Sequence, residues 1–146
     1  MILVQIVEHF PVRRLEWIGS GILIGLGLRL LDPADTFAQP AFRDLAAAFS
    51  ENTWGAALFW IGLGRFLTLA YNGAWKPSPE LRGIFAVFGL LVFASLATGI
   101  ESAGVASTGS ITYAFLALGE ISNIWIAAGD ARVPYSERKR HGKSDH

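Results

Sequence analysis

The sequence of 146 residues contains no cysteine, and only 16% of its residues are charged. The absence of cysteine excludes disulfide bonds, thiolate metal sites and cysteine nucleophiles. A typical soluble protein carries about 25% charged residues, so this chain is depleted in charge. Its formal net charge is zero, so no basic field of the whole protein favours a nucleic-acid partner.

Histidine is scarce, and the motifs of common enzymes are missing. The three histidines, His9, His141 and His146, all lie near the ends of the chain, where nothing fixes the geometry that a metal site needs. The sequence has no Gly-x-Ser-x-Gly, no glycine-rich phosphate-binding loop and no His-Glu-x-x-His. It therefore predicts a protein that is not an enzyme and binds no metal or other cofactor.

What the sequence has in abundance is apolar residues, in four segments. Residues 83–100 contain no charge over a length close to the roughly 20 residues that span a bilayer as a helix. Ser78, Pro79 and Glu80 have the residue types that begin a helix. Residues 54–71 and 108–128 are each interrupted by one charged residue. The pattern predicts four membrane-spanning helices, at about 15–31, 54–71, 82–100 and 108–128.

The first of these segments is short and rich in glycine. Gly21 and Gly25 have the small-xxx-small spacing that allows membrane helices to pack closely, so we expect a helix contact at these two residues. Arg29 stands in the last turn of the segment, from which a long side chain can reach the interface.

A short amphipathic helix is expected between the first two spans, at about residues 40–50. Phe42, Leu45, Ala46 and Phe49 follow helical spacing over a length too short to cross a membrane, so this helix should lie on the membrane surface. The expected fold is all-α: a membrane-embedded four-helix bundle over residues 1–132, with this interfacial helix. Residues 2–10 are read as a short interfacial segment, and residues 133–146 as a basic, disordered tail.

The basic residues predict the orientation. With four spans, nine of the twelve basic residues fall on the side of the two termini, two fall on the other side, and Arg65 lies within a span. Such a bias places the side rich in Lys and Arg in the cytoplasm. We therefore expect a multi-pass inner-membrane protein with cytoplasmic termini, whose basic tail can contact anionic lipids.

Arg65 and Glu120 are the candidate site. A charge inside a bilayer is costly and usually finds a partner. The second and fourth spans run in the same direction, and the two residues lie at matching depth, so an Arg65–Glu120 ion pair is expected. Polar residues share the faces of these helices and form an associated stripe: Thr68, Asn72, Tyr113 and Asn123. The pair could clamp two helices or line an ion path, and its isolation favours the clamp.

Two stretches resemble a known group of proteins. Residues 64–75, followed by Pro79 and Arg82, and residues 119–132 are similar to small four-span membrane proteins of tailed phages and prophages. The likeness covers roughly residues 54–132, and Ile126 departs from it, because that group often has a basic residue there. The group has no settled activity, so the resemblance implies a membrane context and no functional residue.

The expected function is that of a small, non-enzymatic inner-membrane protein of the phage or prophage type. It would act through contacts with the lipid bilayer, with further copies of itself as a homo-oligomer, or with other membrane proteins, in holin-like lysis support or in superinfection exclusion. Two alternatives stay open. One is a small transporter or channel subunit that uses Arg65 and Glu120, and the other is an accessory subunit of a larger membrane complex.

Overall fold

A computed structural model describes residues 13–74 and 78–132, with only the backbone described for residues 72–74, and all regular structure in these ranges is helical. Four long helices carry the fold. Their bounds are α2, Arg14–Leu31; α4, Glu51–Ala74; α5, Pro79–Ser102; and α6, Gly109–Arg132. Three short elements join α2 to α4: the 3-10 turns η1, Thr36–Ala38, and η2, Pro40–Phe42, and the helix α3, Arg43–Ala48.

Three of the long helices are long and apolar enough to cross a membrane: α4 over Glu51–Tyr71, and α5 and α6 over their full lengths. A helix of 24 residues, as α4, α5 and α6 each are, extends about 36 Å and exceeds the ~30 Å hydrocarbon core of a bilayer. Helix α2 is shorter and carries three charged residues, Arg14, Glu16 and Arg29, in its 18 positions. The chain thus has the helices of a membrane protein.

The helix boundaries follow the expected spans, with longer ends. Pro79 begins α5, Ser78 occupies its N-cap position and Glu80 lies in its first turn, which confirms the predicted start. At the end of α4 the backbone stays helical through Asn72 and Gly73, beyond the predicted end of the span at residue 71. The predicted segments 2–10 and 133–146, and with them all three histidines, lie outside the described residues.

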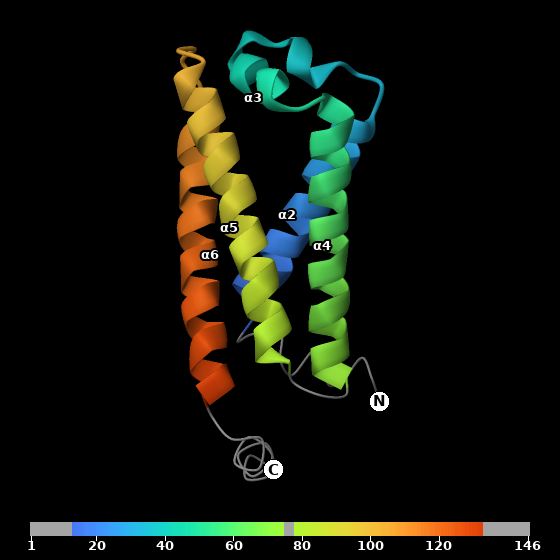
Figure 1. Ribbon diagram of the computed structural model, residues 1–146, viewed down its shortest axis with the longest axis vertical. Coiled ribbons are helices and arrows are strands. Elements are labelled where there is room, and N and C mark those ends of the chain that lie inside the picture. The colour runs from blue at the N-terminus through green and yellow to red at the C-terminus, as the bar shows by residue number, and fades with distance from the viewer. Residues whose placement is uncertain (1–12, 75–77, 133–146) are drawn as a thin grey trace.

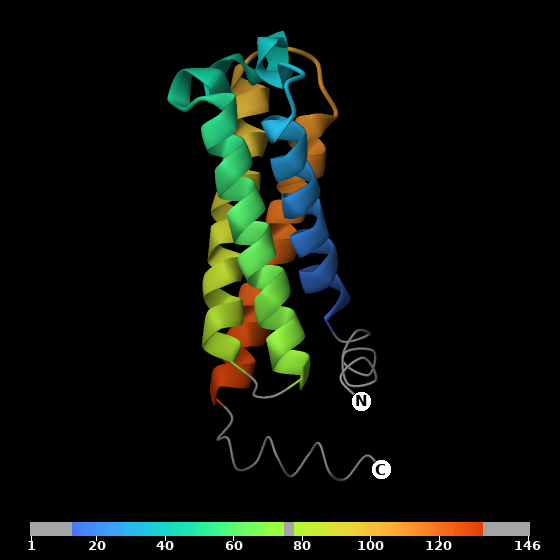
Figure 2. The same ribbon diagram turned by 90° about the vertical axis from the view of Figure 1, so that its right-hand side faces the viewer.

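The four long helices are arranged as two antiparallel pairs, α2 with α4 and α5 with α6 (Figure 1). Figure 2 shows the helices side by side, with the starts of α2 and α5 and the ends of α4 and α6 at one end of the molecule. The members of each pair share a far more extensive contact than the two pairs share with each other. Contacts between the pairs therefore decide whether the four helices form one unit.

Glycines bring α2 and α4 close together. A Cβ atom on Gly27 would lie 2.5 Å from the backbone nitrogen of Phe59, and one on Gly62 would lie 2.8 Å from that of Ile24. Backbones this close leave no room for a side chain, which is how small residues promote packing between membrane helices.

Gly21 and Gly25 make no close helix contact within residues 13–74 and 78–132. Both residues are exposed, and an added Cβ on either would meet nothing within 4 Å. Within the same glycine-rich segment, Gly27 is the glycine that packs against α4, so Gly21 and Gly25 stay a predicted packing face.

The predicted helix at residues 40–50 is divided into η2 and α3. Leu45 is buried and packs against Gly99 of α5, where a Cβ would lie 2.6 Å from the Leu45 side chain. The backbone of Phe49 is extended, with φ −150° and ψ 156°, so this residue ends the helix. It cannot share the helical face of Phe42 and Leu45, because the chain turns there to enter α4.

Contacts with α4 hold this short segment in place. The carboxylate of Glu51 accepts hydrogen bonds from the backbone N–H groups of Thr36 and Phe37, at 2.9 and 3.0 Å. The indole of Trp54 donates to the carbonyl of Leu45 at 3.2 Å. Asp44 on α3 accepts hydrogen bonds from Ser102, the last residue of α5, and from Arg43, and these hydrogen bonds lower the pKa of Asp44. The segment is thus tied to the ends of both α4 and α5.

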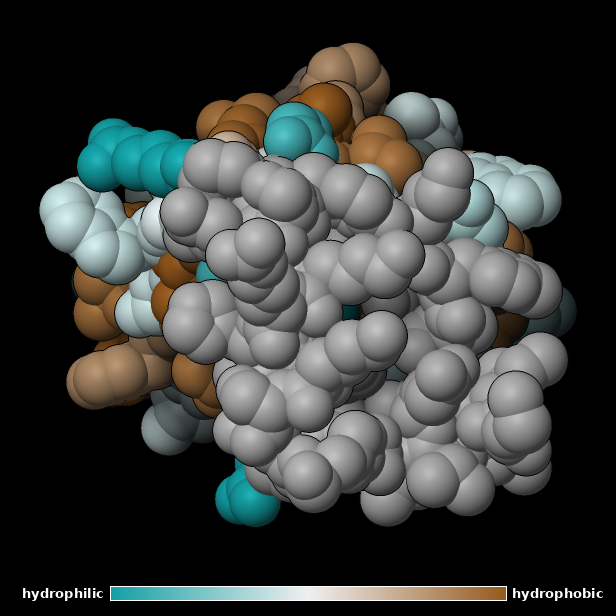
Figure 3. All heavy atoms as spheres, turned by 90° about the horizontal axis from the view of Figure 1, so that it is seen from below, coloured by the Kyte–Doolittle hydropathy of each residue, from teal (hydrophilic) through white to brown (hydrophobic). Residues whose placement is uncertain are grey.

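The outer surface of the long helices is strongly apolar. Large apolar side chains are exposed on α4 and α6: Trp60 on α4 is 66% exposed, and Phe115 and Trp125 on α6 are 69% and 81% exposed. Seen along the helices from the end where α5 begins, hydrophobic residues form parts of the visible edge of the described part, with hydrophilic residues between them (Figure 3). Such a surface suits lipid and would be unusually large for a soluble monomer.

Candidate functional site

The structure brings together the two residues that the sequence analysis paired. The Nη1 group of Arg65 on α4 donates to Oε1 of Glu120 on α6, and their side chains are only 2% and 3% exposed. Asn123, one turn further along α6, donates its Nδ2 group to Oε2 of Glu120 at 3.0 Å. Both oxygens of this carboxylate therefore have donors, as a buried charge requires.

Two glycines give the ion pair its space. A Cβ atom on Gly19 of α2 would lie 2.9 Å from Oε1 of Glu120, and one on Gly89 of α5 would lie 3.0 Å from the same oxygen. Each would also come within 3.3 Å of Nη1 of Arg65. All four long helices therefore meet at this ion pair, two through charged side chains and two through glycine backbone.

Two residues of the predicted polar stripe, Thr68 and Tyr113, make other contacts and do not join the ion pair. Thr68 donates its hydroxyl to the carbonyl of Gly64 at 2.8 Å, within its own helix. Tyr113 is half-buried and stacks on Phe93 of α5, with ring centroids 6.4 Å apart. The side chain of Asn72 lies outside the described residues. Of the three stripe residues whose side chains the structure describes, only Asn123 joins Arg65 and Glu120, and these three residues form the first charged cluster.

One donor of the first cluster remains unused. The Nη2 group of Arg65 is buried, and within the described part of the chain it has no hydrogen-bond partner. The pair is therefore joined through one guanidinium nitrogen instead of the two-pronged contact that Arg and carboxylate groups can form. An unsatisfied buried donor of this kind costs roughly 1–3 kcal/mol.

A second charged cluster lies at the end of the molecule where α5 begins. Arg82 of α5 makes a two-pronged contact with Glu16 of α2, with Nε donating to Oε2 at 2.9 Å and Nη2 donating to Oε1. Its Nη1 group donates to Asp130 of α6 at 2.6 Å. The side chains of Arg82 and Glu16 are 3% and 5% exposed, whereas that of Asp130 is 45% exposed.

Arg13 stands beside this second cluster, immediately before α2. Its Nη1 group is buried and lacks a hydrogen-bond partner among the described residues. Burial lowers the pKa of Arg13, and the nearby positive charge of Arg82 lowers it further, while Glu16 and Asp130 act in the opposite direction. Two guanidinium groups thus face two carboxylates, and the cluster of Arg13, Glu16, Arg82 and Asp130 is neutral as a whole.

Sequence reasoning missed the second cluster, although the signal was present. Arg82 is one of the nine basic residues on the side of the termini that predict the orientation, and the sequence analysis pairs it with neither Glu16 nor Asp130. All three residues lie within the first or last turn of a long helix, and these turns occupy the same end of the molecule. The matching of depth and charge that paired Arg65 with Glu120 applies equally here.

The two clusters join the helix pairs crosswise. Arg65 on α4 contacts Glu120 on α6, and Arg82 on α5 contacts Glu16 on α2, so each buried ion pair runs from one helix pair to the other. Among residues 13–74 and 78–132, no group of three His, Cys, Asp or Glu side chains is arranged to hold a metal ion. What these clusters can do with the groups present is hold four helices together.

Comparison with protein-family models, with characterised proteins and with solved structures finds no match to this chain.

Proposed function

We propose that the chain crosses the inner membrane four times, with α2, α4, α5 and α6 as the spans and both termini in the cytoplasm. What supports this is the antiparallel order of the four helices together with the bias of nine basic residues to two. The charges of α2 do not oppose a fourth span. Glu16 is neutralised by Arg82, and Arg29 at the other end pairs with Asp32 at 3.1 Å. The η1–α3 segment would then lie at the outer membrane surface.

We further propose that the protein acts through contacts with lipid and with other proteins, and carries out no catalysis. The observation that carries this is the enclosure of the first cluster, which consists of Arg65, Glu120 and Asn123. The backbone of Gly19 and Gly89 and the side-chain amide of Asn123 surround its charges, and Arg65 and Glu120 are almost entirely inaccessible to solvent. A pair enclosed in this way is suited to hold helices together and poorly suited to meet a substrate.

Within that class, a small protein of the phage or prophage type is the reading we favour, with holin-like lysis support or superinfection exclusion as its activity. The support is the resemblance over residues 54–132, together with a short chain, an apolar outer surface and a basic C-terminal sequence. Inducible expression in a bacterial host tests both activities. Release of cytoplasmic enzymes when an endolysin is co-expressed would support lysis, and resistance to phage infection without lysis would support exclusion. The absence of both effects, with the protein fully expressed in the membrane, would contradict this proposal.

A second candidate, a subunit of a transporter or channel, is kept because of Arg65. Its Nη2 group is buried without a partner among the described residues, and the oxygen of a water molecule or a passing anion would accept its hydrogen bond. The test is ion flux into vesicles that contain the purified protein. Flux that is lost in Glu120→Gln, whose side chain keeps the same shape, would favour this candidate over contacts alone.

A further inference from the structure

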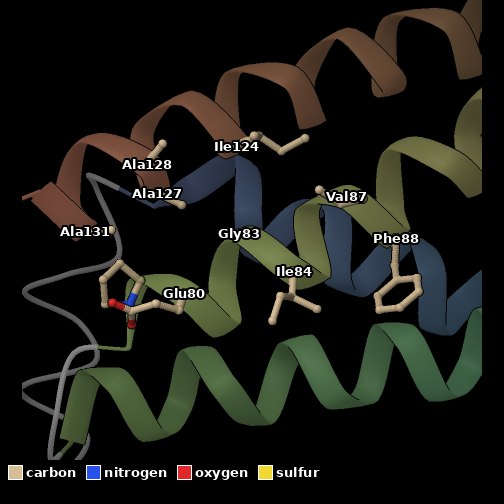
Figure 4. A pocket seen from close by; sticks show the side chains of 10 residues that line it. Glu80, Gly83, Ile84, Val87, Phe88, Ile124, Ala127, Ala128 and Ala131 are labelled. Carbon is tan, nitrogen blue, oxygen red and sulfur yellow. The ribbon is translucent and has the colours of Figure 1, made fainter.

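The outer face of α5 and α6 contains a groove near the end where α5 begins. Its volume is about 390 Å³, and its lining is apolar apart from one residue. Gly83 of α5 and Ala127 of α6 form its floor, where a Cβ on Gly83 would touch the methyl group of Ala127 at 3.7 Å. Ile84 of α5 and Ile124 of α6 line its sides, and Glu80 lines it at the first turn of α5 (Figure 4).

A ridge lies beside the groove on α6. It consists of Trp125, which is 81% exposed, and Arg132, two helical turns further along the same side of the helix. The two side chains border a common hollow of about 100 Å³ together with Ala128 and Gly129. Ala128 also lines the groove, so the ridge and the groove share one wall.

We propose that this face is a dimer interface, in which Trp125 of one copy occupies the groove of a second copy and Arg132 contacts the partner's Glu80. A contact between two identical copies related by a two-fold axis needs one surface that carries both a projection and the hollow that receives it. The ridge and groove meet that condition because they adjoin on one face of α6.

Depth and charge favour this occupant over a lipid chain. In a dimer whose axis runs along the membrane normal, every residue lies at the same depth in both copies. Trp125 is adjacent to Ile124, which lines the groove, so the indole is at the level of the hollow. Arg132 ends α6 at the same end of the molecule where Glu80 lies in the first turn of α5. Neither of these two charged residues makes an ion pair within the described part of the chain.

The energetic source is packing, since lipid is as apolar as the groove. Association of membrane helices depends on filling space closely and on polar contacts, because no hydrophobic force acts between helices in lipid. A tryptophan offers about 150–250 Å² of rigid contact surface for this purpose. Two indoles and two Arg–Glu contacts would be made in each dimer.

The test is the dimer dissociation constant in bilayers, measured by energy transfer between labelled copies of the full chain. Trp125→Ala should raise it about thirtyfold or more, as expected for a central interface residue. Trp60→Ala removes another exposed tryptophan, from α4, and should leave the constant unchanged. Equal effects of the two substitutions, or a parent chain that stays monomeric at high density in the membrane, would overturn the proposal.

A charge exchange tests the same interface without removing bulk. Arg132→Glu should weaken the dimer about tenfold, because two carboxylates would then face each other at each contact, and adding Glu80→Arg should restore it. Failure of the second change to restore the dimer would contradict the proposed pairing. The dimer rests on the proposed membrane orientation, which fusion reporters test separately. A monomer with the expected orientation would therefore refute the dimer alone.

Discussion

Replacement of Arg65 by methionine is the most direct probe of the first cluster. Methionine keeps much of the length of the side chain and removes its charge, so Glu120 would remain 3% exposed with Asn123 as its remaining hydrogen-bond partner. Breaking a buried ion pair by removing one partner costs about 3–5 kcal/mol in soluble proteins, and the same sign is expected in a membrane.

That loss corresponds to a large change in thermal stability. At about 2–4 °C per kcal/mol for a domain of this size, Arg65→Met should lower the melting temperature by about 6–20 °C. The measurement is thermal unfolding of the purified protein in one detergent or lipid nanodisc. Arg29→Met is the matched control, because Arg29 and Asp32 form an exposed pair, with side chains 55% and 54% exposed, that should contribute about 0–1 kcal/mol.

The double variant Arg65→Met with Glu120→Met distinguishes a pair from two independent residues. If the residues act as a pair, the second change removes the uncompensated charge, and apolar packing recovers much of the lost stability. The reasoning is refuted if Arg65→Met is as stable as the parent. It is also refuted if the double variant loses the full sum of the two single effects.

Three further outcomes are expected. Gly89→Ala should destabilise the protein by about 1–3 kcal/mol, as overpacking of a core does, because the new Cβ would lie 3.0 Å from Glu120. Gly21→Ala, where the new Cβ meets nothing within 4 Å, should be neutral or stabilising, and equal melting temperatures of the two variants would contradict this. Glu16→Gln should lower the melting temperature more than Asp130→Asn, since Asp130 is 45% exposed and screened by water. The reverse order would show that Asp130 contributes more than Glu16 to the stability of the second cluster. Reporter fusions at residue 104 and at the C-terminus should report opposite sides of the membrane, and the same side for both would exclude four spans.

Much of the helical layout could be predicted from the sequence, because long apolar runs leave few alternatives. The start of α5 followed from Ser78, Pro79 and Glu80, whose residue types suit the first turn of a helix. The ends of α4 and α6 were less predictable. Asn72 and Gly73 have turn propensities, yet the backbone there continues the helix. Intrinsic propensities of this size are weak predictors of where a helix ends.

The site was predictable only where one residue stood out. Arg65 and Glu120 interrupt apolar runs, so their cost in a membrane identified them. Glu16 and Arg82 lie near helix ends, where charges are common, and their burial depends on how α2 packs against α5. The inward faces of Gly19 and Gly89 were equally hidden, because the rotation of a helix about its axis is fixed by its neighbours and leaves little trace in its own sequence.

The two buried ion pairs join the two pairs of helices, in addition to the apolar core that the four helices share. The glycine contacts of Gly27 and Gly62 hold α2 to α4, but they do not reach α5 or α6. Arg65 of that pair contacts Glu120 on α6, and Glu16 of that pair contacts Arg82 on α5. Each pair of helices therefore presents one positive and one negative buried group to the other. A shift in register or an exchange of helices would leave like charges or single charges buried, so the clusters specify one arrangement as well as stabilising it.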